Sequence, residues 1–147
     1  MDYSIVRGML QAIPFNGHLG IEITEVADGT SVVRLPEATH LHNHVGTQHA
    51  GALFTVAEAA SGAAFAGAFA ERMATIRPLA KSAEIKYLKV ARGPITAKGK
   101  LAEDKATVLA RLDADGRAEF PVEVELFDDA GLMVAVVSVQ WHVKTTA

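Results

Sequence analysis

The segment from Asn43 to Ala70 contains the residues of this chain best suited to chemistry. Glu58 is the only charged residue in the apolar run between His49 and Glu71. Burying an unpaired carboxylate costs free energy, so a carboxylate inside an apolar helix suggests a use. At the expected start of the same helix, Ala50 and Gly51 are small, which lets another molecule approach the free backbone N–H groups. A desolvated carboxylate and a set of N–H donors on one helix resemble the two halves of a catalytic site.

Two plainer interpretations of the same segment were weighed. A run of roughly 20 apolar residues is long enough to span a membrane, but this one is mostly Ala and Gly and carries Glu58 near its centre. It could also be an ordinary core helix whose carboxylate reaches the surface. Against that, one helical face groups the carboxylate with two aromatic residues and leaves no separate polar stripe. That face consists of Gly51, Phe54, Glu58, Ser61, Gly62 and Phe65.

Composition limits the classes of protein and of site. With 147 residues, 50% hydrophobic and 21% charged, the chain predicts one globular domain over residues 1–147. A net charge of −3 gives no reason to expect a nucleic-acid partner. The absence of cysteine excludes disulfides and thiolate metal sites. His40, His42 and His44 have neither a Cys nor a helical His pair beside them, so no metal is expected. Residues 1–13 do not read as a signal peptide, and we expect a cytoplasmic protein with no membrane partner.

The elements that must position Glu58 follow from periodicity and turn signals. An N-terminal helix within residues 1–14 should end at Pro14, and a central helix should span residues 50–70. Residues 82–91 predict a half-buried strand with Ala83, Ile85 and Tyr87 toward the core. The other predicted elements are strands at 20–27, 31–35, 95–101, 120–126 and 132–143, with a short helix at 104–113. This order predicts an α+β fold in which an antiparallel sheet wraps around one long central helix.

The order of elements resembles the hotdog fold, and the central segment resembles the phenylacetate-type branch of hotdog acyl-CoA thioesterases. The motif of that branch is an Asn, a His-Gly-Gly six residues later, and an Asp or Glu nine residues after the His. Here the corresponding positions are Asn43, His49-Ala50-Gly51 and Glu58, with both spacings intact. Residues 85–93 resemble the family's strand after the helix, including its aromatic residue and closing Gly.

The chain departs from the family pattern at two positions. Ala50 replaces the first Gly of His-Gly-Gly and still supplies its backbone N–H. Ala80 stands where several relatives carry a Ser or Thr, and Ser82 is the nearest hydroxyl.

The resemblance implies a function, an assembly and a set of site residues. It implies hydrolysis of acyl-CoA thioesters, with coenzyme A as part of the substrate and no other cofactor. It implies a homodimer or a dimer of dimers with active sites at the sheet-edge interface. Asn43, His49, Ala50 and Gly51 would come from one subunit and Glu58 from the other. Lys86, Lys89 and Arg92 are candidates to hold the coenzyme A phosphates.

Two alternative functions remain open at this point. A hotdog dehydratase acting on 3-hydroxyacyl thioesters would use a His and a Glu, and His44 lies fourteen residues before Glu58. Its Met-Pro-Gly helix start is missing, however. A non-catalytic acyl-CoA-binding module is the other alternative, and Ala50 and Ala80 are the residues that suggest it.

Overall fold

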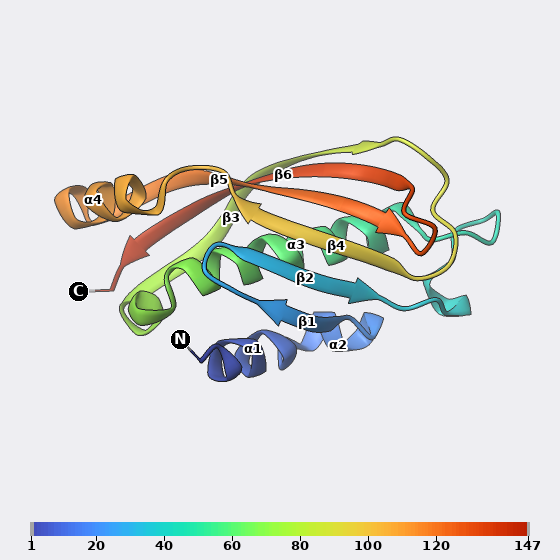
Figure 1. The fold of residues 1–147 in the computed structure, drawn as a ribbon, viewed down its shortest axis with the longest axis horizontal. Coiled ribbons are helices and arrows are strands. Elements are labelled where there is room, and N and C mark those ends of the chain that lie inside the picture. Colours follow the sequence, from blue (N-terminus) through green and yellow to red (C-terminus); the bar gives the residue numbers. More distant parts are fainter. Residues whose placement is uncertain (1, 147) are drawn as a thin grey trace.

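One antiparallel sheet wraps around a single long helix (Figure 1). The computed structural model describes residues 2–146. The sheet has six strands in the order β1-β2-β4-β5-β6-β3, and all neighbours are antiparallel. The strands are β1 (Glu22–Val26), β2 (Thr30–Leu35), β3 (Ile76–Tyr87), β4 (Ile95–Leu101), β5 (Arg117–Asp128) and β6 (Met133–Thr145). The predicted α+β class and the wrapped-helix architecture are confirmed.

The central helix, α3, runs from Ala50 to Ala68, close to the predicted range of 50–70. By length and hydropathy alone it could span a membrane, but 67% of its apolar window is buried inside the fold. It is a core helix. Its many Ala and Gly residues matter because they leave little side-chain volume between the helix and the sheet that curves over it.

The helix and the sheet approach each other closely at three points. A Cβ atom added at Gly67 would lie 1.9 Å from the carbonyl oxygen of Ala27. On the facing strand β4, a Cβ atom at Gly99 would lie 2.5 Å from the carbonyl oxygen of Ala60. The buried Ser31 hydroxyl of β2 donates a hydrogen bond of 2.6 Å to the same Ala60 oxygen. Only small residues permit this spacing, and it fixes which face of α3 looks away from the sheet.

The N-terminal segment forms two helices instead of one. α1 spans Ser4–Gln11, and Pro14, which was expected to end the helix, instead begins a second helix, α2 (Pro14–Leu19). Proline fits there because the first helical position needs no N–H donor and accepts a fixed φ. The prediction of a single helix over residues 1–14 is therefore wrong in this respect.

Gln11, the last residue of α1, attaches the helix to the outer edge of β1. Its amide nitrogen donates a 2.8 Å hydrogen bond to the carbonyl oxygen of Ile21, and its amide oxygen accepts one of 2.8 Å from the N–H of Ile23. The side chain thus pairs with backbone groups of β1 as a neighbouring strand would.

The strand β3 lies at the opposite edge of the sheet and differs from the prediction at both ends. It begins at Ile76 and ends at Tyr87, whereas residues 82–91 were expected. Pro78 lies inside it, which an edge strand tolerates. The predicted core face is wrong for this chain, since Ala83 and Tyr87 are exposed and Ile85 is only half-buried. Alternation of apolar and polar residues indicates that a strand has two different faces. It does not tell whether the strand lies at an edge of the sheet, where less of the fold covers its side chains.

The remaining elements lie at the ends of the sheet. α4 spans Lys105–Asp115, close to the predicted short helix, and the Asp104 carboxylate caps it by accepting from the N–H of Thr107. Two short 3-10 segments, η1 (Thr39–Leu41) and η2 (Ala70–Thr75), lead into and out of the region around α3.

The spacing between α3 and the sheet predicts a sharp difference between two glycines of the same helix. We expect Gly67→Ala to lower the free energy of unfolding by about 3 kcal/mol or more, since its Cβ would overlap backbone that cannot move freely. Gly62→Ala is the matched control, because its Cβ would lie 3.5 Å from Trp141, an ordinary contact. There we expect no loss, or a gain of about 0.5–1 kcal/mol from better helix propensity. Urea denaturation measures both, and equal stability of the two variants would contradict the spacing.

Candidate active site

Glu58 lines a pocket of about 340 Å³ that α3 forms with α1, α2, Trp141 of β6 and Pro78 of β3. A volume of this size falls within the range of small-ligand pockets. Glu58 is the only titratable side chain among the residues that line it, within the part of the chain that the structure describes. Burial of the carboxylate raises the pKa of Glu58. The lining residues are Val6, Met9, Leu10, Ile13, Asn16, Glu58, Ala59, Gly62, Phe65, Ala66, Met73, Pro78 and Trp141.

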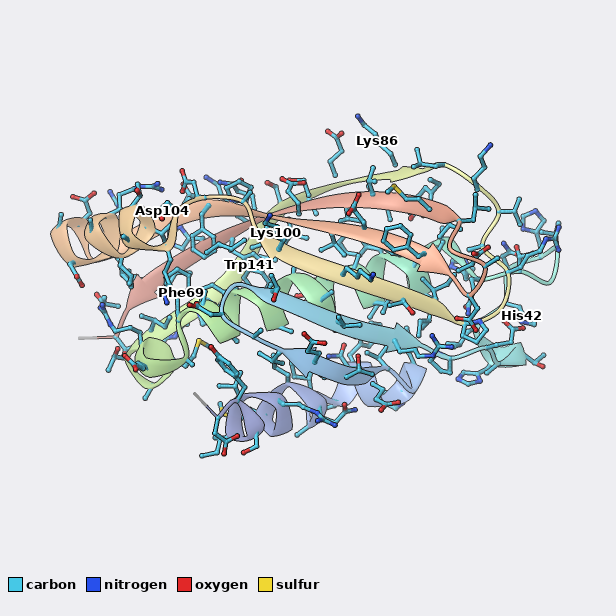
Figure 2. All side chains as sticks on the ribbon, in the orientation of Figure 1. His42, Phe69, Lys86, Lys100, Asp104 and Trp141 are labelled. Atoms are coloured by element: carbon cyan, nitrogen blue, oxygen red, sulfur yellow. The ribbon has the colours of Figure 1, made fainter. Side chains whose placement is uncertain are left out.

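Trp141 of β6 forms part of the pocket wall. Its indole N–H donates a hydrogen bond of 3.1 Å to the hydroxyl of Ser61, which in turn donates one of 2.7 Å to the carbonyl oxygen of Glu58. The Phe65 ring stacks on the indole with centroids 5.8 Å apart. Figure 2 shows Trp141 between the sheet and α3. These contacts link the pocket wall to the same turn of helix that carries the carboxylate.

The start of α3 is capped by His49. The imidazole Nδ1 accepts a hydrogen bond of 2.8 Å from the N–H of Gly51, so this donor is already used within the chain. The Tyr87 hydroxyl donates one of 3.0 Å to the carbonyl oxygen of Ala50. Ala50 itself is exposed, and its N–H has no hydrogen-bond acceptor within residues 2–146. Of the N–H groups of Ala50 and Gly51, the one at Ala50 is therefore free for a ligand.

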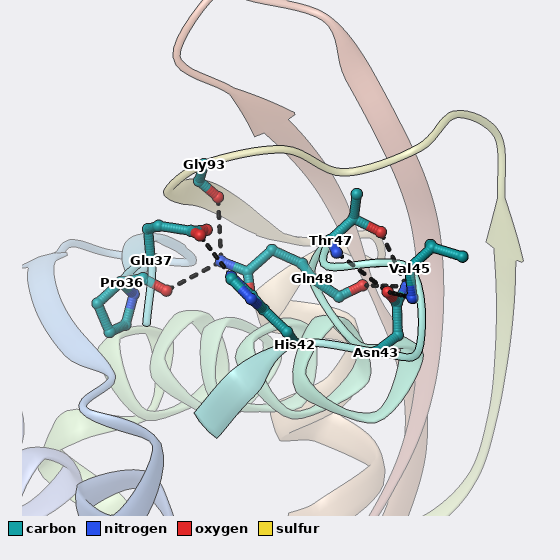
Figure 3. Close-up of polar contacts among 8 residues, drawn as sticks. All are labelled: Pro36, Glu37, His42, Asn43, Val45, Thr47, Gln48 and Gly93. Atoms are coloured by element: carbon teal, nitrogen blue, oxygen red, sulfur yellow. Dashed lines mark hydrogen bonds and ion pairs between the residues drawn. The ribbon is translucent and has the colours of Figure 1, made fainter. Parts of the chain in front are cut away.

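The loop before α3 is organised by Asn43 (Figure 3). Its amide oxygen accepts from the N–H groups of Val45 and Thr47, both at 3.0 Å. Its amide nitrogen donates to the Thr47 hydroxyl at 2.8 Å. Asn43 thus has a structural role within its own chain, in addition to any part in chemistry.

Gln48 ties this loop to the rest of the fold. Its amide nitrogen donates to the carbonyl oxygens of Pro36 and Gly93, at 2.9 and 3.0 Å (Figure 3). The side chain is 2% exposed, and its amide oxygen is buried without a partner among the described residues. Leaving that oxygen unpaired costs free energy, which the two bonds from the nitrogen offset. Gln48 therefore holds the start of α3 in register with the loop after β3.

The predicted site residues fall into two groups in a single chain. Asn43, His49, Ala50 and Gly51 cluster at the start of α3, and none of them lines the pocket of Glu58. Glu58 lies eight positions after Ala50 on the helix, a distance of about 12 Å along the axis. One chain therefore does not bring the N–H donors and the carboxylate to one point.

The cationic candidates belong to the segment that contacts the start of α3, through the hydrogen bonds from Tyr87 to Ala50 and from Gln48 to Ala91. Lys86, Lys89 and Arg92 are exposed, near the end of β3 and in the loop after it. Lys86 forms an ion pair of 3.6 Å with Glu84, and its side chain extends outward from the sheet in Figure 2.

The predicted loop histidines are engaged or exposed. His42 pairs with the carboxylate of Glu37 (Figure 3), and His44 is exposed at the tip of the loop. No group of three or more His, Cys, Asp or Glu side chains suited to a metal ion occurs within residues 2–146.

Residues 3–143 match a protein family described as a domain of unknown function, DUF4442. The chain belongs to the DUF4442 family. No curated protein sequence matches this DUF4442 chain significantly.

Solved structures resemble the DUF4442 chain over nearly its whole length. PA5026 from Pseudomonas aeruginosa, a protein of unknown function called a probable thioesterase, has a TM-score of 0.87 and 28% identity, covering 99% of this chain and 97% of that one. The thioesterase HI1161 from Haemophilus influenzae gives a TM-score of 0.76 and 17% identity, with 93% and 87% covered. The PaaI protein of the phenylacetic acid degradation operon of Escherichia coli gives 0.70 and 19%, with 93% and 88% covered. At such identities the last two show the fold alone.

These likenesses confirm the hotdog fold that the sequence resemblance predicted. This DUF4442 chain is a less characterised relative of the hotdog thioesterases. The roles of the individual site residues stay predictions.

Sequence reasoning missed two parts of this DUF4442 site. The wall that α1 and α2 contribute was not anticipated, although the apolar spacing of Val6, Met9, Leu10 and Ile13 was a usable signal. The buried Asn16 in the same wall carried no signal, because a lone Asn after Pro14 reads as a turn residue.

The raised pKa of Glu58 predicts a pH-dependent effect on stability. The folded protein holds the proton of Glu58 more tightly than the unfolded chain, so this contribution is full below the ordinary pKa of 4.5 and is lost as the pH rises through the folded-state pKa. We expect Glu58→Gln to be more stable than wild type at about pH 7 and close to it at about pH 4. Urea denaturation at both values measures the effect.

The exposed Glu25 of β1 provides the control for this comparison. Glu25→Gln should change the free energy of unfolding little at either pH. A Glu58→Gln variant less stable than wild type at neutral pH would show instead that the carboxylate makes favourable contacts.

Proposed function

We propose that this DUF4442 domain hydrolyses acyl-CoA thioesters to a free acid and coenzyme A. The observation that carries the proposal is the lone carboxylate of Glu58 in an otherwise largely apolar pocket. An apolar pocket suits an acyl group, and a carboxylate whose pKa is raised by burial is a better proton acceptor near neutral pH than an ordinary one. The likeness to PA5026, called a probable thioesterase, supports the same reaction class.

The reaction requires one water molecule per thioester. A water oxygen attacks the carbonyl carbon while Glu58 takes a proton from it. The developing negative charge on the carbonyl oxygen is stabilised by the free N–H of Ala50 and the positive end of the α3 dipole. Collapse of the intermediate breaks the carbon–sulfur bond, and the coenzyme A thiolate recovers the proton. Direct attack by Glu58, through a short-lived anhydride, is the other route that the same groups allow.

We infer that the complete site forms between two copies of the chain. The separation of about 12 Å between Ala50 and Glu58 along α3 is too long for one thioester carbonyl to meet both within a subunit. In the proposed dimer, Asn43, His49 and the Ala50 N–H of one subunit face Glu58 of its partner. His49 keeps the N–H of Gly51 occupied and so leaves Ala50 as the donor. Lys86, Lys89 and Arg92 at the outer edge then suit the coenzyme A phosphates.

The activity test is a panel of short, long and aromatic acyl-CoA thioesters with a thiol-detecting reagent. We expect thiol release by the wild type and a loss of 10² or more in kcat for Glu58→Gln, about the size of a general-base contribution. Glu25→Gln is the control and should keep full activity. A folded Glu58→Gln variant with near-wild-type hydrolysis would remove Glu58 from the mechanism.

The same panel separates the alternative functions. A 3-hydroxyacyl thioester dehydratase interconverts hydroxyacyl and enoyl thioesters with the thioester intact. A non-catalytic module binds acyl-CoA and releases no thiol. Either result, in place of thiol release, would reject the hydrolase.

The assembly has its own test at the edge strand β3. An exposed strand edge is a template for pairing with another chain, and Leu79 on β3 is 64% exposed. We expect light scattering at micromolar concentration to give the mass of a dimer or of a dimer of dimers. Leu79→Lys should shift it toward the monomer, because lysine on an edge strand opposes pairing. The control is Ile5→Lys, which alters an exposed residue of α1. A wild-type monomer would contradict the two-subunit site.

A further inference from the structure

Asn16 is a second polar side chain in the pocket of Glu58, and its amide has no partner. The residue is 4% exposed and lines the pocket from α2. Its carbonyl oxygen accepts from the N–H groups of Gly20 and Ile21. Its side-chain amide makes no hydrogen bond to any other described residue, from 2 to 146. Among the described residues only the Gln48 amide oxygen is a buried side-chain atom without a partner, so the Asn16 amide is accessible from the pocket. It is therefore free to bind a molecule inside it.

The course of the chain places Asn16 at the Glu58 end of the pocket. Tyr3, just before α1, lines a neighbouring cleft together with Gly67 and Arg72, so α1 starts beside the end of α3. The chain then runs back along α3 through α1 and α2, as Figure 1 also shows. Among the pocket residues of this run, Val6 comes first and Asn16 comes last. The amide and the carboxylate therefore share the end of the pocket where the reaction is proposed.

Among residues 2–146, no hydroxyl side chain lines the pocket to hold a water molecule. The lining includes no Ser, Thr or Tyr from this range, and Ser82 on β3 is exposed and does not line it. Asn16 is the one neutral amide side chain that these described residues place there, with a donor and an acceptor to offer. A water molecule at this end of the pocket can therefore form hydrogen bonds to the side chains of Glu58 and Asn16.

We propose that the side-chain amide of Asn16 holds the hydrolytic water beside Glu58, a role that rests on the proposed thioester hydrolysis. The amide oxygen accepts one O–H of the water, while the other O–H points to the Glu58 carboxylate. As the water oxygen bonds to the carbonyl carbon, Glu58 takes the second proton and the first stays with the new acid. The leaving thiolate takes the proton from Glu58, so atoms and charge balance.

Removal of the amide is the first test. Asn16→Leu has a similar size without polar atoms, and we expect kcat to fall about 10- to 100-fold with KM little changed, the cost of a poorly placed nucleophile. Asn16→Ser, which leaves a small hydroxyl, should fall less. Thermal unfolding monitors the fold of each variant, and full activity in a folded Asn16→Leu would overturn the proposal.

The second test places a carboxylate at position 16 and measures the pH profile of kcat/KM. If Asn16 had only a structural role, this substitution would not shift the profile. Asn16→Asp is isosteric and puts a like charge at the Glu58 end of the pocket, where Glu58 is the only titratable group. We expect the acidic limb of kcat/KM to move up by about one pH unit. His18→Asp is the matched control, since His18 lies on the same helix but is exposed outside the pocket. An unmoved limb in Asn16→Asp, or an equal shift in both variants, would overturn the proposal.

The activity measurements distinguish a failure of the Asn16 role from a failure of the proposed hydrolysis. If the wild type releases no thiol from any substrate, hydrolysis itself fails and the role of Asn16 fails with it. If the wild type hydrolyses, Glu58→Gln is inactive and Asn16→Leu is as active as wild type, only the role of Asn16 fails.

Discussion

The close contact between α3 and the concave face of the sheet is the constraint on which the rest of the structure depends. Backbone oxygens of one layer lie where side chains of the other would otherwise extend, as at Gly67 and Gly99. Because the two layers interlock through backbone, α3 cannot rotate about its axis without a clash. Glu58 is consequently held on the side of α3 where α1, α2, Phe65 of the same helix and Trp141 of β6 enclose the pocket.

The fixed orientation of α3 about its axis also explains how the fold tolerates a carboxylate on this helix. The sheet-facing side of α3 is fully buried, and an ionised group there would have no solvent. Glu58 is only half-buried, and this partial burial raises the pKa of its carboxyl group. The hydrogen bonds from Trp141 to Ser61 and from Ser61 to the Glu58 carbonyl fix the helix turn beneath it. The Glu58 carboxylate is thus carried by a helix turn that hydrogen bonds tie to Trp141 of the sheet.

The sequence was most informative where local chemistry decides the structure. The Ala- and Gly-rich run of α3 and the Asn43–His49–Glu58 spacing depend on residues near one another, and they led to the right fold. The exposure of β3 could not be predicted, because alternation does not reveal which strands lie at an edge. The pocket wall from α1 and α2 depends on tertiary packing between segments some fifty residues apart, for which one sequence gives no spacing rule. The hydrogen bond from Tyr87 to Ala50 had no signal in the sequence either, because it joins residues 37 positions apart.

The two edges of the sheet differ in a way that limits growth. Gln11 already occupies backbone donor and acceptor groups at the β1 edge, with the geometry of a strand neighbour. The β3 edge has no such cover within residues 2–146. Open-ended polymers need two complementary edges on each copy, since every added copy must offer a fresh surface to the next. With one edge blocked by its own side chain, a sheet of this kind can be extended once and then terminates, which protects a long exposed strand from fibre formation.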